Sequence, residues 1–160
     1  MRPVSILTFL IFTFCSFGQN FILSDGEYMD TTSGNNEQCK EVNTYYYSVG
    51  GKYPESSSSL LKEAQIFLEK NSKTYSNNGY ITFRFRINCD GKMMKKVQVL
   101  QTDENYKTNH FDKMFVNELF SFIKILDKWK IAKTKKDEPY SYITFITFKI
   151  KNGKVINIIP

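Results

Sequence analysis

Few side chains in this sequence stand at spacings that support catalysis or metal binding. His110 is the single histidine and has no Cys at ligand spacing, which argues against a metal site. The serines over 56–59 lack a nearby base to activate a nucleophile and suit a helix N-cap instead. Asp103 and Glu104 are adjacent acids in a polar stretch, so solvation explains them without a glycosidase role. We therefore expect no enzymatic activity and no cofactor.

A group of basic side chains is a candidate binding surface. Arg84, Arg86 and Lys96 share the outward face of a predicted hairpin with Tyr80. Basic and aromatic groups on one sheet surface are typical of nucleic-acid binding, and the same charges suit lipopolysaccharide or another acidic ligand. A solvated face that keeps a short sheet soluble explains the pattern without any ligand.

The N-terminal segment has the composition of an export signal. Arg2 supplies a positive charge, and an almost entirely apolar run follows over 4–17. As a helix this run would rise about 21 Å, which is short of the roughly 30 Å hydrocarbon core of a bilayer. Small residues precede Gln19 at the positions a signal peptidase requires, so we expect 1–18 to be a cleaved signal peptide. An uncleaved anchor is the alternative.

Export makes the protein periplasmic or secreted, and it argues against a nucleic-acid partner. The oxidising compartment favours a disulfide between Cys39 and Cys89. This bridge would close a loop of about 50 residues and stabilise the fold by roughly 4 kcal/mol in the chain-entropy treatment. The alternative is that Cys89 is a small buried residue without a partner, because it has the same parity as Ile87 in the preceding strand.

The composition is that of one globular domain. The 160 residues are 41% hydrophobic and 24% charged, and they carry a formal net charge of +6. These values exclude a collagen-like or fully disordered chain. Fourteen Phe and ten Tyr supply large apolar side chains for a core.

Hydrophobic periodicity predicts a polar arm over 19–52, with a short strand at 44–49, and a domain over 53–160. Within the domain we expect, in order, a helix over 57–70, strands over 79–87 and 93–101 joined by an Asp90-Gly91 turn, a helix capped by Asn109, a strand over 140–150 and a tail over 155–159. The last strand has apolar residues of both parities, which requires either a bulge or burial on both faces.

This order of elements predicts an α+β fold. The hairpin and the closing strand form a small antiparallel sheet, and two helices pack on one face of it. Alternation in the first long strand places Ile81, Phe83 and Phe85 on the face toward the helices. Phe115 and Phe122, at helical spacing, are the residues expected to meet them.

Several motifs resemble the TonB C-terminal domain family. They are Tyr53-Pro54, the strand and turn over 79–92, the segment Leu126 to Ala132 with Trp129, and Pro139 followed by the Phe-rich strand over 143–148. Their order and spacing resemble that family from about Tyr53 to Ile150. Trp129 and Pro139 are carried over only as fold markers, and we expect Trp129 to pack in the core.

The resemblance implies a stand-alone periplasmic domain that lends a sheet edge to a peptide of a partner, such as an outer-membrane receptor or transport component. In this mode backbone groups of an unpaired edge supply affinity and alternate side chains supply selectivity. The expected edge is the closing strand, at Tyr142, Thr144, Ile146 and Phe148. The same edge could pair with a second copy and form a homodimer.

Overall fold

The computed structural model describes residues 27–29, 39–70, 73–94 and 97–160. The predicted signal peptide over 1–18, its cleavage before Gln19, and Lys96 lie outside these ranges. The strands are β1 (Glu27–Met29), β2 (Lys40–Tyr45), β3 (Gly79–Ile87), β4 (Val97–Thr102), β5 (Ala132–Lys133), β6 (Pro139–Lys151) and β7 (Lys154–Ile159), and the helices are α1 (Tyr46–Val49), α2 (Ser57–Leu68) and α3 (Lys113–Lys124). The fold is α+β, as the sequence predicts.

One seven-stranded sheet organises the fold, in the order β1-β4-β3-β6-β2, with β5 and β7 also paired to β6. β3 pairs antiparallel with β6 without interruption, from Gly79 opposite Ile150 to Ile87 opposite Tyr142. The pairing of β2 with β6 is parallel. The sheet is therefore mixed, whereas the sequence predicted antiparallel pairing throughout. The difference arises because the arm, and not only the hairpin, adds a strand.

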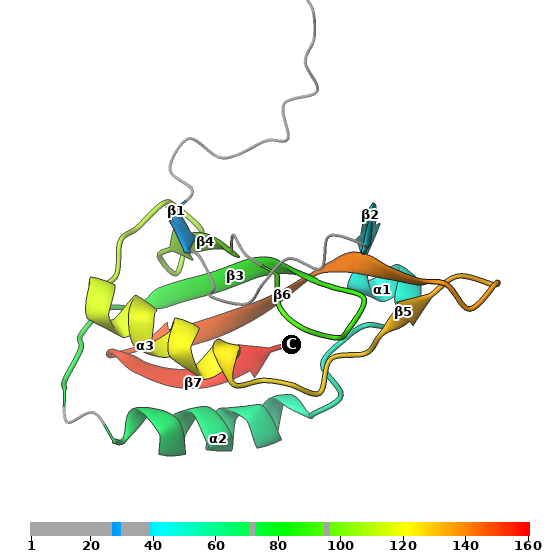
Figure 1. Ribbon diagram of the computed structural model, residues 1–160. Coiled ribbons are helices and arrows are strands. Elements are labelled where there is room, and N and C mark those ends of the chain that lie inside the picture. Colours follow the sequence, from blue (N-terminus) through cyan, green and yellow to red (C-terminus); the bar gives the residue numbers. More distant parts are fainter. Residues whose placement is uncertain (1–26, 30–38, 71–72, 95–96) are drawn as a thin grey trace, which may run out of the picture.

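The two long helices cover one face of the sheet, with α3 in front of it and α2 beside β7 in Figure 1. The alternating residues of β3 that face the helices are buried, as predicted. The ring of Phe148 lies 6.0 Å from that of Phe83 and 6.2 Å from that of Phe122 on α3. Phe67 of α2 contacts the same ring of Phe122 at 5.7 Å. Aromatic contacts thus join both helices and the sheet in one core.

Side-chain caps fix the start of each long helix. The Ser56 hydroxyl accepts a hydrogen bond from the backbone N–H of Ser59 and begins α2. Asp112 caps α3, and its carboxylate accepts from the N–H groups of Met114 and Phe115. The prediction of Asn109 as the cap is wrong, because the Asn109 N–H donates to a carbonyl of β4 and the chain stays extended there.

The arm turns where a strand was predicted to continue. Tyr45 ends β2, and Tyr46–Val49 forms the short helix α1, so the predicted strand over 44–49 is wrong for its last four residues. Gly50 ends α1 in the left-handed region, with φ +58°. The ring of Tyr46 packs edge-on against Phe145 of β6 at 5.2 Å, which draws the chain back over the sheet.

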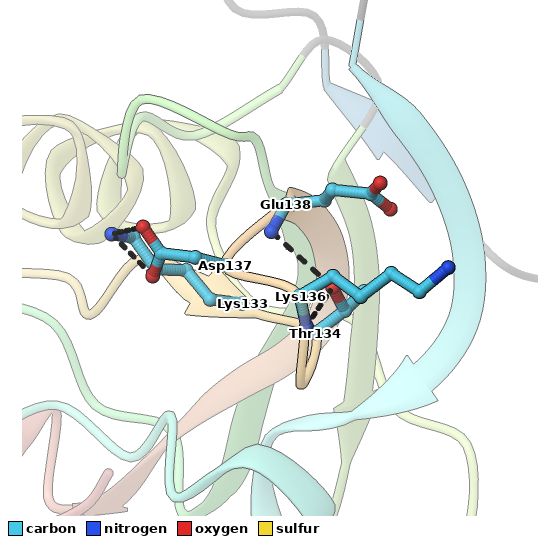
Figure 2. Close-up of polar contacts among 5 residues, drawn as sticks. All are labelled: Lys133, Thr134, Lys136, Asp137 and Glu138. Atoms are coloured by element: carbon cyan, nitrogen blue, oxygen red, sulfur yellow. Dashed lines mark hydrogen bonds and ion pairs between the residues drawn. The ribbon is translucent and has the colours of Figure 1, made fainter.

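Two turns shape the connections between strands. In the Asp90-Gly91 turn, the Asn88 carboxamide accepts from the N–H groups of Asp90 and Lys92, and Gly91 takes φ +72°. The β5–β6 turn depends on Thr134, whose hydroxyl accepts from two backbone N–H groups, while Lys133 and Asp137 form an ion pair at 3.0 Å (Figure 2). In the return strand after Gly91, Met93 forms an isolated bridge with Ile87, and β4 pairs with β3 from Gln98 to Thr102.

The C-terminal tail expected over 155–159 forms a strand, β7. β7 pairs with β6 through a tight turn at Asn152 and Gly153, with one register shift. Val155 and Ile158 are buried against α2 and the sheet. The apolar residues of both parities in β6 are explained by burial on both faces, since Tyr142, Ile146 and Phe148 face the helices and Ile143 faces the other side next to β2.

Candidate functional site

The strand predicted to offer an open edge is the most enclosed strand of the sheet. On one flank β6 pairs with β5 and then with β3. On the other flank it pairs with β2 near Tyr140 and with β7 from Thr147 onward, and α1 lies against the interval between them. The prediction that the closing strand is a free edge is therefore wrong. The tail and the arm, both read from the sequence as irregular or short, supply the strands that cover it.

The four residues expected to contact a partner lie in the core. Tyr142, Thr144, Ile146 and Phe148 are all buried on the helix face of the sheet. The Tyr142 hydroxyl donates to the Lys130 carbonyl at 2.9 Å, and burial raises the pKa of this phenol to about 12. Their role is packing, because none of these side chains reaches the surface.

The outer margin of β7 carries no further strand within the described parts of the chain. The N–H of Ile158, which stands opposite Phe148 in the ladder with β6, donates to the side-chain oxygen of its neighbour Asn157 at 2.9 Å. The Val155 carbonyl accepts from the Gln65 carboxamide of α2 at 3.3 Å. Side chains, and not another strand, satisfy these backbone groups at the margin.

Two large apolar side chains of β7 are solvent-exposed. Ile156 is 41% exposed and Ile159 is 47% exposed. Unpaired edges of this kind are where sheets accept another strand. Within the described residues, β7 thus has an outer edge that pairs with no strand, with α2 beside it through the Gln65 bond to Val155.

A cavity of about 430 Å³ lies between α2, α3 and the beginning of β7. Gln65, Tyr75, Glu118 and Lys154 are among the residues that line it. The Tyr75 hydroxyl donates to the Glu118 carboxylate at 3.1 Å, and burial together with this carboxylate raises the pKa of Tyr75 to about 12. The cavity can accommodate a side chain with both polar and apolar parts.

The predicted basic face lies on the side of the sheet away from the helices, and its two described arginines hold the arm. Arg86 donates to the Val42 carbonyl, to the Ser141 hydroxyl and to the Asn43 carboxamide. Arg84 donates to the Gln98 carboxamide and the Tyr45 hydroxyl, 3.2 Å in each case. Both arginines are half-buried, so this face is only partly the solvated surface that the simplest interpretation requires.

The disulfide between Cys39 and Cys89 is present, with a Cα–Cα distance of 5.5 Å. It decides between the two alternatives for Cys89 in favour of the bridge. The bridge ties the start of β2 to the turn after β3, next to the arginine contacts with the same strand. The arm is therefore attached both covalently and through hydrogen bonds.

The remaining candidates of the sequence have structural roles in the described parts of the chain. Ser56 is a helix cap, and the Asp103 carboxylate accepts from the N–H groups of Asn105 and Lys107 in a turn. Trp129 is buried between Tyr53 and Phe85, with ring distances of 4.7 and 5.3 Å. Across the described ranges, no three His, Cys, Asp or Glu side chains come together as a metal site.

Comparison with known proteins adds no relative. No protein-family model matches the chain, and no curated protein or solved structure is significantly similar to it. The helices of the described segments are all too short or too polar to cross a bilayer. The resemblance to the TonB C-terminal domain therefore stays a hypothesis that depends on the motifs alone.

Proposed function

We propose that this protein is an exported, non-catalytic binding module that accepts an extended peptide of a protein partner along the outer edge of β7. The observation that carries the proposal is that β7 pairs with β6 and with no other described strand, while the Ile158 N–H donates to the Asn157 side chain. A peptide carbonyl can replace that side-chain oxygen without breaking the sheet. Ile156 and Ile159 supply exposed apolar surface next to it.

The cavity near the start of β7 suits a role in selectivity. Gly153, Lys154 and Val155 line it together with residues of α2 and α3. A strand added along β7 has alternate side chains on each face, so one of them is within reach of this cavity. The polar residues of the cavity favour a partner side chain that carries a hydrogen-bonding group.

Export and a link to outer-membrane transport belong to the same proposal. The disulfide supports an oxidising compartment, because such bridges are rare in reducing ones. The TonB-like motifs, from Tyr53-Pro54 to the Phe-rich strand, support a partner at the outer membrane. A second copy of the protein could pair along the same β7 edge. The oligomeric state is therefore measured before peptide binding.

The test uses the full disulfide-bonded chain and peptides selected from a displayed library of random 12-residue sequences. A selected peptide is measured against wild type, Ile156→Pro and Ile156→Thr. Proline places a ring at the edge and removes an N–H, whereas threonine keeps the backbone unchanged. We expect Ile156→Pro to weaken binding at least tenfold and Ile156→Thr to weaken it by less than threefold. Ile125→Thr, at a 60% exposed isoleucine far from β7 in sequence, is the control.

Methylated peptides provide the second part of this test. Only every other peptide N–H faces β7 in an added strand, so N-methylation of one alternate set should abolish binding and methylation of the other set should not. Equal effects of both sets, or equal binding by Ile156→Pro and wild type, would refute the edge as the binding site. Circular dichroism melts establish that each variant is folded.

A second function is favoured by a separate observation on the other surface. Within the described residues Arg84 and Arg86 contact neutral groups and no carboxylate. The basic face, which the sequence extends to Lys96, is therefore the candidate site for an acidic ligand such as lipopolysaccharide. Salt-sensitive binding would identify this mode, since a peptide on the β7 edge depends little on ionic strength.

A further inference from the structure

The face of the sheet away from the helices is arranged in rows that run across the strands. Cross-strand pairing places Ile159, Thr147, Thr82 and Leu100 side by side, in the order β7, β6, β3, β4. The neighbouring row on one side contains Lys149 and Tyr80, and the row on the other side contains Phe145 and Arg84. A row of small or aliphatic side chains thus lies between two rows of large ones.

This difference in side-chain size produces a groove. Its cavity volume is about 400 Å³, and Tyr45, Thr82, Arg84, Leu100, Phe145 and Thr147 line it. The hydroxyls of Thr82 and Thr147 bond to each other at 2.9 Å and form a floor that needs no further partner. The groove is therefore mainly apolar, and it contains one cation and no anion.

Arg84 is held in a fixed position at the wall of the groove. It donates one hydrogen bond to Gln98 and one to the Tyr45 hydroxyl, and its guanidinium carbon lies 5.8 Å from the centre of the Tyr45 ring. A guanidinium has five N–H donors, so three have no hydrogen-bond partner among the described residues. Among the described residues no carboxylate is paired with it. A half-buried cation with only neutral partners is an incomplete electrostatic arrangement, and a ligand anion would complete it.

We propose that this groove binds a carboxylate attached to an aromatic or compact apolar body. The carboxylate would accept hydrogen bonds from the free N–H groups of Arg84, and the apolar body would lie over Thr82 and Thr147 between Leu100 and Phe145. The positive charge of Arg84 favours the carboxylate, and the rings of Tyr45 and Phe145 favour the apolar part of the ligand. Both a free aromatic acid and the C-terminal residue of a peptide have this chemistry. The site is separate from the β7 edge, so the two proposals can fail independently.

The probe is N-acetylphenylalanine, titrated into the full disulfide-bonded chain and followed by amide chemical shifts. For a ligand of this size we expect a Kd of about 1 mM, with the largest shifts at Thr82, Leu100 and Thr147. N-acetylphenylalanine amide has the same body without the charge and should bind at least tenfold more weakly. Saturation below the solubility limit for the acid, and none for the amide, is the supporting result.

Two variants separate the charge from the shape of the groove. Arg84→Gln removes the cation and should reduce affinity for the acid to that of the amide. Leu100→Trp fills the groove, leaves Arg84 in place, and should weaken the acid and the amide alike. Arg86→Gln is the matched control, because Arg86 lies on the same strand face, also holds the arm, and does not line the groove.

The binding results test the location of the site and distinguish a free acid from a peptide C-terminus as the ligand. Equal affinity for acid and amide, unchanged binding by Arg84→Gln, or shifts confined to Lys154, Val155 and Ile156 of β7 would overturn the proposal. Thermal melts of each variant exclude unfolding as the reason for lost binding. If 3-phenylpropionate binds as well as a tetrapeptide ending in phenylalanine, the ligand class is a free acid. If only the tetrapeptide binds, the ligand class is a chain terminus.

Discussion

At the scale of single residues, Tyr142 is a polar group fully enclosed in the core. Its ring lies against Gly51, where a Cβ would come within 2.5 Å of the ring, and its hydroxyl bonds to the Lys130 carbonyl. A bulkier residue at position 51 would displace the ring. The Tyr142 hydroxyl thus holds the loop before β5 at Lys130, and the ring packs against Gly51.

The raised pKa of Tyr142 predicts a particular alkaline behaviour. The pKa is about 12 in the folded protein and about 10 in the unfolded chain. The folded state retains the proton more strongly, so this stabilisation is complete below pH 10 and is lost as the pH rises through 12. Tyr142→Phe should be less stable than wild type by about 1 kcal/mol at pH 8, because it lacks the hydrogen bond.

The difference between the two proteins should shrink above pH 10, vanish at about pH 11 and change sign toward pH 12, because only wild type has a buried phenol to ionise. Urea unfolding of both proteins at a series of pH values measures this difference in the free energy of unfolding. Tyr47→Phe, at an exposed tyrosine, is the control and should follow wild type throughout. A constant difference between Tyr142→Phe and wild type from pH 8 to 12 would contradict the assignment.

At the scale of elements, the start of α3 separates the observed cap, Asp112, from the predicted cap, Asn109. Asp112 accepts from two backbone N–H groups, and its charge lies at the positive end of the helix dipole. Asp112→Ala should therefore lower the free energy of unfolding by about 1 kcal/mol. Asn109→Ala, three residues earlier, should change it by less than about 0.5 kcal/mol. Chemical denaturation of both variants tests this, and a larger effect at Asn109 would contradict it.

The elements that could be predicted are those with long, regular periodicity. The alternation from Gly79 to Ile87 gives β3 its burial pattern, and the stripe of Phe115, Leu119 and Phe122 gives α3 its buried face. Where the structure differs from the sequence prediction, long-range contacts determine the local conformation. Asn109 is drawn onto β4, and Tyr46 is drawn onto Phe145, by residues distant in the sequence.

The location of the edge could not be predicted because it depends on strand order. Val155 to Ile159 has the composition of a strand, but a short apolar tail does not specify which neighbour it joins. Once it pairs with β6, the predicted edge becomes interior. The groove was also inaccessible to sequence reasoning, since it requires the register of four strands at once.

At the scale of the whole molecule, β2 is attached to the domain by interrupted strand pairing, a disulfide and two arginine side chains. Its regular pairing with β6 is broken between Glu41 and Tyr45, and the disulfide and the two arginines supply the remaining connections. Replacing both cysteines by serine should lower the free energy of unfolding by about 2 to 4 kcal/mol. Amide exchange should accelerate mainly over 40–49, while β3 remains protected.

Hydrogen exchange with mass spectrometry measures the protection of 40–49 and of β3 in the double variant. Reduction of the wild-type protein should reproduce the pattern of the double variant, which separates loss of the bridge from the serine substitutions. If 40–49 stays as protected as β3 after reduction, the disulfide has no role in attaching the arm.

The position of β6 along the chain also bears on biosynthesis. It is the common partner of β2, β3, β5 and β7, yet all but the last of these leave the ribosome before it. Until Pro139 to Lys151 has been synthesised, the earlier segments have only the hairpin and no central ladder, so most of the native contacts are deferred. A nascent polypeptide that folds late remains unfolded during synthesis, which the export proposed above would require.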